Sequence, residues 1–142
     1  MKRTMLIGAI GSGKTTLIQR LTNEKLKYNK TQSIEYSPDF IDTPGEYIEH
    51  HNMESSLRVI SMNADIIVLL QSAIDKRLVF PVGFCTMFNK PALGLITKID
   101  QVKNSDDIKY SKNLLLRAGV DKVIPISSVT GENIEKVQLA LK

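Results

Sequence analysis

The fold is decided by one stretch of the sequence, Gly8-Ala9-Ile10-Gly11-Ser12-Gly13-Lys14-Thr15. This stretch matches the pattern G-x-x-x-x-G-K-[ST], whose glycines let consecutive backbone N–H groups point at phosphate oxygens. A largely apolar run, Thr4–Ile7, comes before it, and apolar residues at helical spacing follow it at Leu17, Ile18 and Leu21. A strand, a glycine-rich loop and a helix in this order predict a phosphate-binding loop, because an ordinary glycine-rich turn lacks that context.

Each polar group of this loop has an expected partner on a nucleoside triphosphate. Lys14 would place its charge between the β- and γ-phosphates, and the hydroxyl of Thr15 would bind Mg²⁺. The positive end of the following helix adds to the attraction for phosphate. We therefore expect Mg²⁺ together with GTP or ATP as ligands. The residues predicted to bind the nucleotide here are Gly8, Gly11, Ser12, Gly13, Lys14, Thr15 and Thr16.

A second phosphate element is predicted in the segment Phe40-Ile41-Asp42-Thr43-Pro44-Gly45. Asp42 follows an apolar strand and can hold Mg²⁺ through water, and the N–H of Gly45 can sense the γ-phosphate. The alternative is a plain exit from a strand, since these are also ordinary turn residues. Upstream, the hydroxyl of Thr31 is a further candidate ligand of Mg²⁺, with a solvated loop threonine as the alternative.

Short apolar runs and helical spacing alternate through the rest of the chain. The expected strands are Thr4–Ile7, Ile66–Leu70, Ala92–Ile96 and Val123–Ile126. Their residues do not alternate in polarity, which is typical of parallel strands buried on both faces, and a proline in the last run favours the sheet edge. Helices are expected around Met53–Ile60, at 105–118 with a stop at Gly119, and at 134–141, and a short one within Phe80–Asn89.

This alternation predicts a three-layer α/β/α domain with a mostly parallel central sheet. The interval between Lys14 and Asp42 is short for a helix, a loop and two full strands. We therefore expect a shortened second strand around Ile34–Tyr36, followed by a turn at Ser37-Pro38-Asp39.

Composition bounds the class of protein. The 142 residues fit a single domain covering 1–142, and the lone Cys85 excludes an internal disulfide, as expected of a cytoplasmic protein. No apolar run reaches the ~18–20 residues of a membrane span, so no membrane partner is expected. A net charge of +4 is weak support for a nucleic-acid partner, and none is expected. His50, His51 and Cys85 lack metal-ligand spacing.

Four motifs stand in the order of the small Ras-like GTPases: residues 8–15, 42–45, Thr97-Lys98-Ile99-Asp100 and Ser127-Ser128-Val129-Thr130-Gly131. The chain further resembles the ethanolamine-utilisation and propanediol-utilisation small P-loop proteins of bacterial microcompartment operons. Residues 5–8, 30–32, 34–36, 42–47 and 96–100 support that resemblance, which spans nearly the whole chain. It implies a Ras-like G domain, association with a microcompartment, and shell or enzyme proteins as partners.

The resemblance also implies how a base is recognised. Where Ras-like proteins have N-K-x-D, Asp100 would accept from the guanine N1–H and exocyclic amine, and Lys98 would lay its stem along the ring. The backbone of Ser127 and Ser128 would approach O6. Thr97 replaces the asparagine of that motif. We expect one bond to the base or to the phosphate loop to be lost or shortened. The preference for guanine should therefore survive but weaken, and ATP is kept as an alternative ligand.

Catalytic expectations rest on Lys14 and Glu46. Glu46 stands where many Ras-like enzymes have a water-positioning glutamine, and its negative charge near the γ-phosphate predicts slow turnover; alternatively, it only begins a helix. The bulky Ile10 disfavours activation by a partner's arginine, and Gly11 predicts no potassium dependence. We assign Arg77, which lies in no recognised motif, to the surface charges, together with Arg20, Arg58 and Arg117.

Three functions remain open from the sequence. The first is a GTPase-like, nucleotide-switched protein of ethanolamine or propanediol catabolism. The second is an ATP-dependent acetate kinase using Lys14, Thr15 and Asp42, since acetate kinase activity has been attributed to the ethanolamine branch, although no carboxylate-binding arginine is evident. The third is a non-catalytic module that binds nucleotide and docks on a shell protein.

Overall fold

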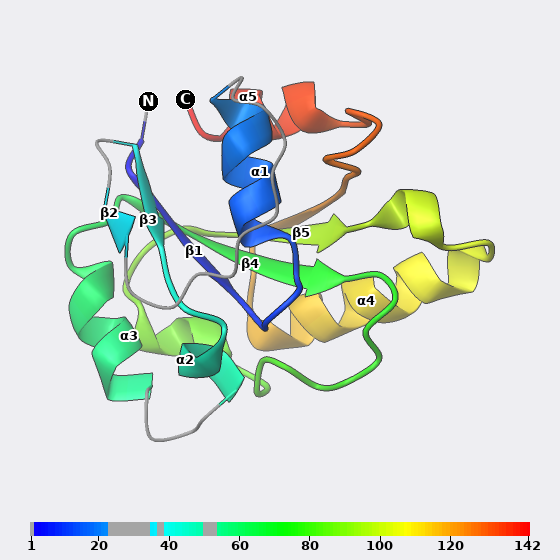
Figure 1. The fold of residues 1–142 in the computed structure, drawn as a ribbon. Helices are drawn as coiled ribbons and strands as arrows, with labels where there is room; N and C mark the ends of the chain where they lie inside the picture. Colours follow the sequence, from blue (N-terminus) through cyan, green and yellow to red (C-terminus); the bar gives the residue numbers. More distant parts are fainter. Residues whose placement is uncertain (1, 23–34, 37–38, 50–53) are drawn as a thin grey trace.

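Figure 1 shows the computed structural model of the chain, which describes residues 2–22, 35–36, 39–49 and 54–142. The predicted Mg²⁺ ligand Thr31, the histidines at 50 and 51 and the turn residues at 37 and 38 lie outside the described residues. The elements are β1 (Thr4–Gly8), α1 (Lys14–Leu21), β2 (Glu35–Tyr36), β3 (Phe40–Asp42), α2 (Glu46–Glu49), α3 (Glu54–Ser61), β4 (Ile66–Ser72), the 3₁₀ helix η2 (Phe84–Met87), β5 (Ala92–Thr97), the 3₁₀ helix η3 (Ile99–Gln101), α4 (Ser105–Ala118), β6 (Lys122–Pro125) and α5 (Ile134–Ala140).

The central sheet has the strand order β2-β3-β1-β4-β5-β6. The pairs from β3 to β6 are all parallel, and among the described strands only the two-residue β2 runs antiparallel, against β3. Every residue of β1, β4 and β5 is buried, which agrees with the uninterrupted apolar runs of these strands. The prediction that the proline-containing strand lies at the edge is confirmed, because β6 pairs with β5 alone.

Helices cover both faces of the sheet (Figure 1), with α1 and α5 on one side and α2, α3 and α4 on the other. Successive residues of a strand point to opposite faces. Leu6 accordingly belongs to the same core as Leu17 of α1 and Val137 of α5. Met5 points the other way and shares a core with Leu57 of α3 and Leu115 of α4. One apolar core therefore lies on each face of the sheet, and the predicted three-layer architecture is confirmed.

The connection from β4 to β5 has no full helix. Phe80, Phe84 and Phe88 recur every fourth residue and are all buried in the core shared with α3 and α4, with ring centroids 5.4 and 5.2 Å apart. Only the four residues of η2 are helical, because Pro81 precedes them and Gly83 at φ 77° places its backbone in the left-handed region. The expected short helix in this segment is therefore a single 3₁₀ turn.

The boundaries of α4 follow from side chains at its two ends. The Oδ1 of Asn104 accepts from the N–H of Asp106 at 2.9 Å, which caps the first turn, and Gly119 ends the helix in the left-handed region. The helix spans Ser105–Ala118, as predicted, although the capping side chain is Asn104, one residue before the expected start. Within the described ranges, no helix has both the length and the apolar character needed to cross a membrane.

Candidate functional site

The candidate site lies where the loops after β1, β3 and β5 meet at the carboxyl ends of parallel strands. In the sheet, β1 lies between β3 and β4. The strands that follow β1 in the sequence are therefore added first on its one edge, as β3 and β2, and then on its other edge, as β4, β5 and β6. Open α/β sheets place ligands at such a reversal of strand order. The fold therefore brings the predicted phosphate motifs to the edge of the sheet where a ligand is expected.

The phosphate loop connects β1 directly to the first turn of α1. The N–H of Ser12 donates to the carbonyl of Ala9 at 3.0 Å, which tightens the loop. Gly13 has φ 98° and its carbonyl accepts from the N–H of Leu17 at 2.9 Å, so the helix begins immediately after it. A side chain at this φ would be strained, which explains the glycine. The N-terminal N–H groups of α1 consequently face the loop.

Lys14 is a buried cation at the centre of this arrangement. Its side chain is 6% exposed and its Nζ donates to the carbonyl of Gly8 at 2.8 Å. Burial lowers the pKa of the amine, and the carboxylates of Asp42, Glu46 and Glu49 raise that pKa in part. An anion that reaches this amine would stabilise its charged form. The predicted phosphate lysine thus lies in a setting that favours a bound anion.

The two described candidate metal ligands are adjacent. The hydroxyl of Thr15 donates to Oδ2 of Asp42 at 3.2 Å, and Asp42 is 3% exposed at the end of β3. A hydroxyl and a carboxylate are the hard oxygen donors that Mg²⁺ prefers, and phosphate sites supply few protein ligands beyond these. In the parts of the chain that the structure describes, no group of three His, Cys, Asp or Glu side chains is placed to hold a metal. The donor set therefore fits Mg²⁺ held jointly with phosphate oxygens.

The segment after β3 lies directly against the phosphate loop. Thr43 anchors it, since its hydroxyl donates to the carbonyl of Leu6 at 2.8 Å. A Cβ added to Gly45 would lie 2.4 Å from the backbone nitrogen of Ile10, so a residue with a side chain cannot approach this closely. Glu46 is the first residue of α2 and its carboxylate is one of those acting on Lys14. Both interpretations of Glu46, a helix start and a charge near the phosphates, are compatible with this position.

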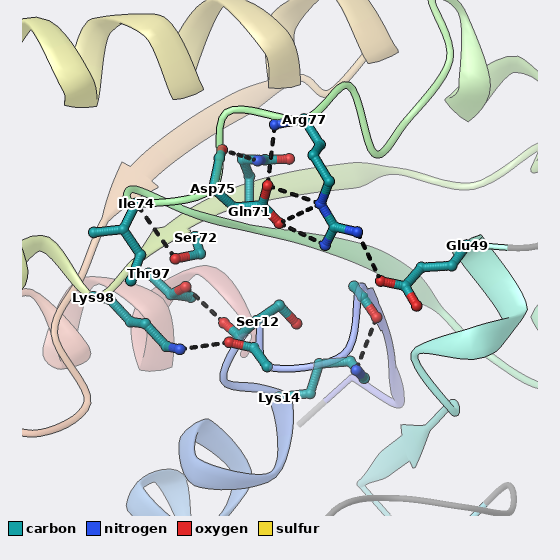
Figure 2. A network of polar contacts seen from close by, with 12 residues as sticks. Ser12, Lys14, Glu49, Gln71, Ser72, Ile74, Asp75, Arg77, Thr97 and Lys98 are labelled. Atoms are coloured by element: carbon teal, nitrogen blue, oxygen red, sulfur yellow. Dashed lines mark hydrogen bonds and ion pairs between the residues drawn. The ribbon is translucent and has the colours of Figure 1, made fainter.

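The predicted base motif also contacts the phosphate loop. The hydroxyl of Thr97, 3% exposed, donates to the carbonyl of Ser12 at 2.6 Å, and Nζ of Lys98 donates to the carbonyl of Gly11 at 2.5 Å (Figure 2). Thr97 thus has a bond to the loop. The expectation that one bond to the base or to the phosphate loop is lost or shortened relative to asparagine stays a prediction.

The last two motifs are joined through one hydrogen bond. The hydroxyl of Ser127 donates to Oδ1 of Asp100 at 2.8 Å, and the N–H of Thr130 donates back to the Ser127 hydroxyl at 3.1 Å. Ser127 is fully buried, whereas Asp100 is exposed in the middle of η3, which begins at Ile99 just after the left-handed Lys98. The carboxylate is therefore fixed in direction at the surface, which is the position that a base-reading group requires.

Sequence reasoning missed a polar network beside this site (Figure 2). Arg77, which we had assigned to the surface charges, donates to both carboxylate oxygens of Asp75 and also to Glu49 of α2. No local pattern could reveal the pairing with Glu49, because it joins segments 28 residues apart. An aspartate two positions before an arginine, as Asp75 is before Arg77, is too common to serve as a signal.

Comparison with known proteins places the chain in a family. A family model described as "Ethanolamine utilisation - propanediol utilisation" matches residues 1–142. "Propanediol utilization protein PduV" of Citrobacter freundii is 39% identical over 141 residues, which are 99% of this chain and 93% of PduV. "Probable acetate kinase EutP" of Escherichia coli strain K12 is 29% identical over 97% of this chain and 86% of EutP.

Two solved structures share the architecture. Era, solved with MgGDPNP and part of 16S ribosomal RNA, aligns with a TM-score of 0.67 and 21% identity over 99% of this chain. The alignment covers 55% of Era, so this chain spans about half of its length. A "probable GTP-binding protein engB" aligns with a TM-score of 0.67 and 25% identity over 96% of this chain and 94% of its own. The chain therefore belongs to the PduV-EutP family of ethanolamine and propanediol utilisation proteins and has the α/β fold of the P-loop GTPases.

Proposed function

We propose that the chain is a Mg²⁺-dependent nucleotide-binding protein, a slow GTPase that serves ethanolamine or propanediol utilisation. The observation that supports this most directly is the convergence of Lys14, Thr15 and Asp42 at the carboxyl ends of β1 and β3. There, a buried amine lies on the phosphate loop and the Thr15 hydroxyl lies 3.2 Å from the Asp42 carboxylate. We further propose that residues 1–142 act as one domain and that microcompartment shell or enzyme proteins are its partners.

The chain's own groups would divide the work of binding and hydrolysis. The backbone of the loop and the Lys14 amine bind the β- and γ-phosphates, and Thr15 with Asp42 holds Mg²⁺, which neutralises charge on the phosphate oxygens when bound. The N–H of Gly45 contacts the γ-phosphate, and Glu46 orients the attacking water. The negative charge of Glu46 opposes the developing charge on the phosphoryl group, so turnover is slow.

Base recognition would fall to the motifs after β5 and β6. Asp100 accepts from the two guanine N–H donors, a pairing that adenine cannot offer, and the Ser127–Ser128 backbone approaches O6. The Ser127 hydroxyl already orients the Asp100 carboxylate at 2.8 Å. Lys98 lies along the ring, with its Nζ bonded to the Gly11 carbonyl. GTP is therefore the expected ligand, with weaker binding of ATP.

An ATP-dependent acetate kinase is the second candidate, favoured by the name of the relatives from Escherichia coli and Salmonella. The same phosphate residues would serve it, with an acetate oxygen attacking the γ-phosphorus in place of water and ADP leaving, which gives acetyl phosphate. Arg77 binds carboxylates in this chain, but both are its own, Asp75 and Glu49. A third candidate is a non-catalytic shell-docking module that only exchanges nucleotide.

Phosphorus NMR distinguishes these candidates in one experiment. The protein is incubated with Mg²⁺ and GTP or ATP, each with and without acetate, and Lys14→Ala serves as the control for contaminating enzymes. A slow GTPase produces inorganic phosphate from GTP at a rate that acetate does not change. Acetyl phosphate that forms from ATP and is absent with Lys14→Ala would overturn the GTPase proposal in favour of the acetate kinase. If neither nucleotide is turned over, the result would overturn both enzymes in favour of the non-catalytic docking module.

A further inference from the structure

The polar network beside the site begins inside the sheet. Gln71 is the sixth residue of β4 and 1% exposed, and its Nε2 donates to the carbonyl of Asp75 at 2.8 Å. The N–H of Asp75 donates to the carbonyl of Ser72 at 3.1 Å, and the N–H of Ile74 donates to the Ser72 hydroxyl at 3.3 Å. The turn after β4 is therefore held to the buried end of the strand, so Asp75 has a rigid support.

Asp75 fixes the direction of the Arg77 guanidinium. Nε and one terminal nitrogen of Arg77 donate to the two carboxylate oxygens at 3.0 and 2.8 Å, and the backbone N–H of Arg77 donates to Oδ1 at 3.0 Å. Such a two-pronged arrangement orders an arginine side chain far better than a single contact does. The Arg77 hydrogen bond lowers the pKa of Asp75, so the carboxylate stays charged at neutral pH.

The remaining terminal nitrogen of Arg77 reaches α2. It donates to Oε1 of Glu49 at 3.2 Å, and the Glu49 side chain is only 23% exposed, compared with 60% for Arg77 (Figure 2). The helix α2 in turn holds Gly45, because the N–H groups of Ile48 and Glu49 both donate to the Gly45 carbonyl at 3.3 Å. A continuous chain of contacts thus runs from the sheet through Arg77 to the residue that lies against the phosphate loop.

We propose that Arg77 is a positioning residue that ties α2 to the sheet and thereby sets Gly45 over the phosphate loop for contact with the γ-phosphate of a nucleoside triphosphate. This inference rests on the proposed function, which assigns Gly45 to the γ-phosphate. A diphosphate lacks the γ-phosphate and so would not make this contact. Arg77 therefore affects the difference in affinity between a triphosphate and a diphosphate, and leaves the affinity for the diphosphate unchanged.

The same turn supplies a matched control. Lys76, the neighbour of Arg77, pairs with Asp107 of α4 and lies over the ring of Tyr110, 4.9 Å from its centroid. This ion pair is also exposed, but α4 does not lead to Gly45. Lys76→Gln therefore removes a comparable ion pair from the same turn without disturbing α2, whereas Arg77→Gln breaks the connection to it.

The test compares the binding of Mg·GDP and of a non-hydrolysable Mg·GTP analogue to the full chain and its variants by calorimetry. Arg77→Gln should weaken triphosphate binding by a factor of about three to five, the range of an exposed ion pair, with diphosphate binding unchanged. Glu49→Gln should lower the ratio of triphosphate to diphosphate affinity by a similar factor, while the loss of its negative charge near Lys14 shifts both affinities together. The double variant should lose no more of this ratio than either single one, because both remove the same contact. Arg77→Lys should not restore binding, since an ammonium cannot hold Asp75 and Glu49 together in this geometry. Lys76→Gln should match the wild type.

Hydrogen exchange of the nucleotide-free protein gives an independent reading. The amides of Ile48 and Glu49 should exchange faster in Arg77→Gln than in Lys76→Gln, and 1 M salt should reduce the difference because it screens the exposed pair. An unchanged ratio of triphosphate to diphosphate affinity in Arg77→Gln would overturn the inference while leaving the proposed function intact. A wild type that binds the triphosphate analogue no more tightly than the diphosphate would also overturn the inference, whereas a wild type that binds neither nucleotide would overturn the proposed function.

Discussion

Replacement of Thr97 by valine should loosen the phosphate loop and weaken the binding of all nucleotides alike. The hydroxyl of Thr97 is 3% exposed and donates to the Ser12 carbonyl at 2.6 Å, and valine keeps the shape but removes the donor. Loss of a buried hydrogen bond that leaves its acceptor behind costs about 1–2 kcal/mol. For a chain of this size that cost corresponds to a fall of about 3–6 °C in the unfolding temperature.

The lost Thr97–Ser12 hydrogen bond should also weaken nucleotide binding, because the loop binds phosphates best when its backbone is already in place. Part of the cost in stability is then paid again as lower affinity. We expect both GTP and ATP to bind up to about tenfold more weakly, with their ratio unchanged. Thermal unfolding and calorimetric titration measure the two quantities. Thr86→Val is the matched control, because the Thr86 hydroxyl also donates to a backbone carbonyl, that of Gly83 at 2.7 Å. Thr86 is exposed, so this replacement should lower the stability by less than about 0.5 kcal/mol. The reasoning is refuted if Thr97→Val unfolds at the temperature of Thr86→Val, or if it changes the ratio of GTP to ATP affinity, which would mean that Thr97 contacts the base.

Three further predictions address the base, the chemistry and the lone thiol. Asp100→Asn should reduce GTP affinity about 10- to 100-fold while sparing ATP, because it removes the acceptor for the two guanine donors, and competition binding that finds GTP affinity unchanged would disprove the base assignment. Glu46→Gln should raise the single-turnover rate of γ-phosphate release several-fold by removing a negative charge near the phosphates, and a slower variant would show that the carboxylate assists the reaction. Burial raises the pKa of the Cys85 thiol to about 11, so its alkylation rate in the native protein should keep rising about tenfold per pH unit from pH 8 to 10, whereas a plateau near pH 9 would contradict that burial.

Much of the fold was predictable because local patterns correspond to single physical causes. Non-alternating apolar runs identified the buried parallel strands, and Pro125 identified the edge strand, since proline cannot donate to a further neighbour. The segment around Phe84 was harder, because three phenylalanines at helical spacing compete with a proline and a glycine that interrupt the helix. There the burial of aromatic rings, rather than backbone propensity, determines the structure.

The site was predictable as motifs but not as contacts. The hydroxyl of Thr97 and the carbonyl of Ser12 are 85 positions apart, and only the parallel sheet brings them to one edge. The same holds for Arg77 and Glu49, whose pairing depends on how α2 sits beside the turn after β4. A sequence read by itself therefore gives the residues of a candidate phosphate site, while their mutual orientation comes from packing between distant elements.

The central claim is that Lys14, Thr15 and Asp42 form a Mg²⁺-dependent triphosphate site. Calorimetric titration of GTP into the wild type, with Mg²⁺ and then with excess EDTA, tests it most directly when repeated with Lys14→Ala. We predict one nucleotide per chain, weaker binding without Mg²⁺, and a loss of about tenfold to 150-fold in Lys14→Ala, as expected for a hydrogen bond between charged groups. No binding of GTP or ATP to the wild type, or equal binding to Lys14→Ala, would contradict the account.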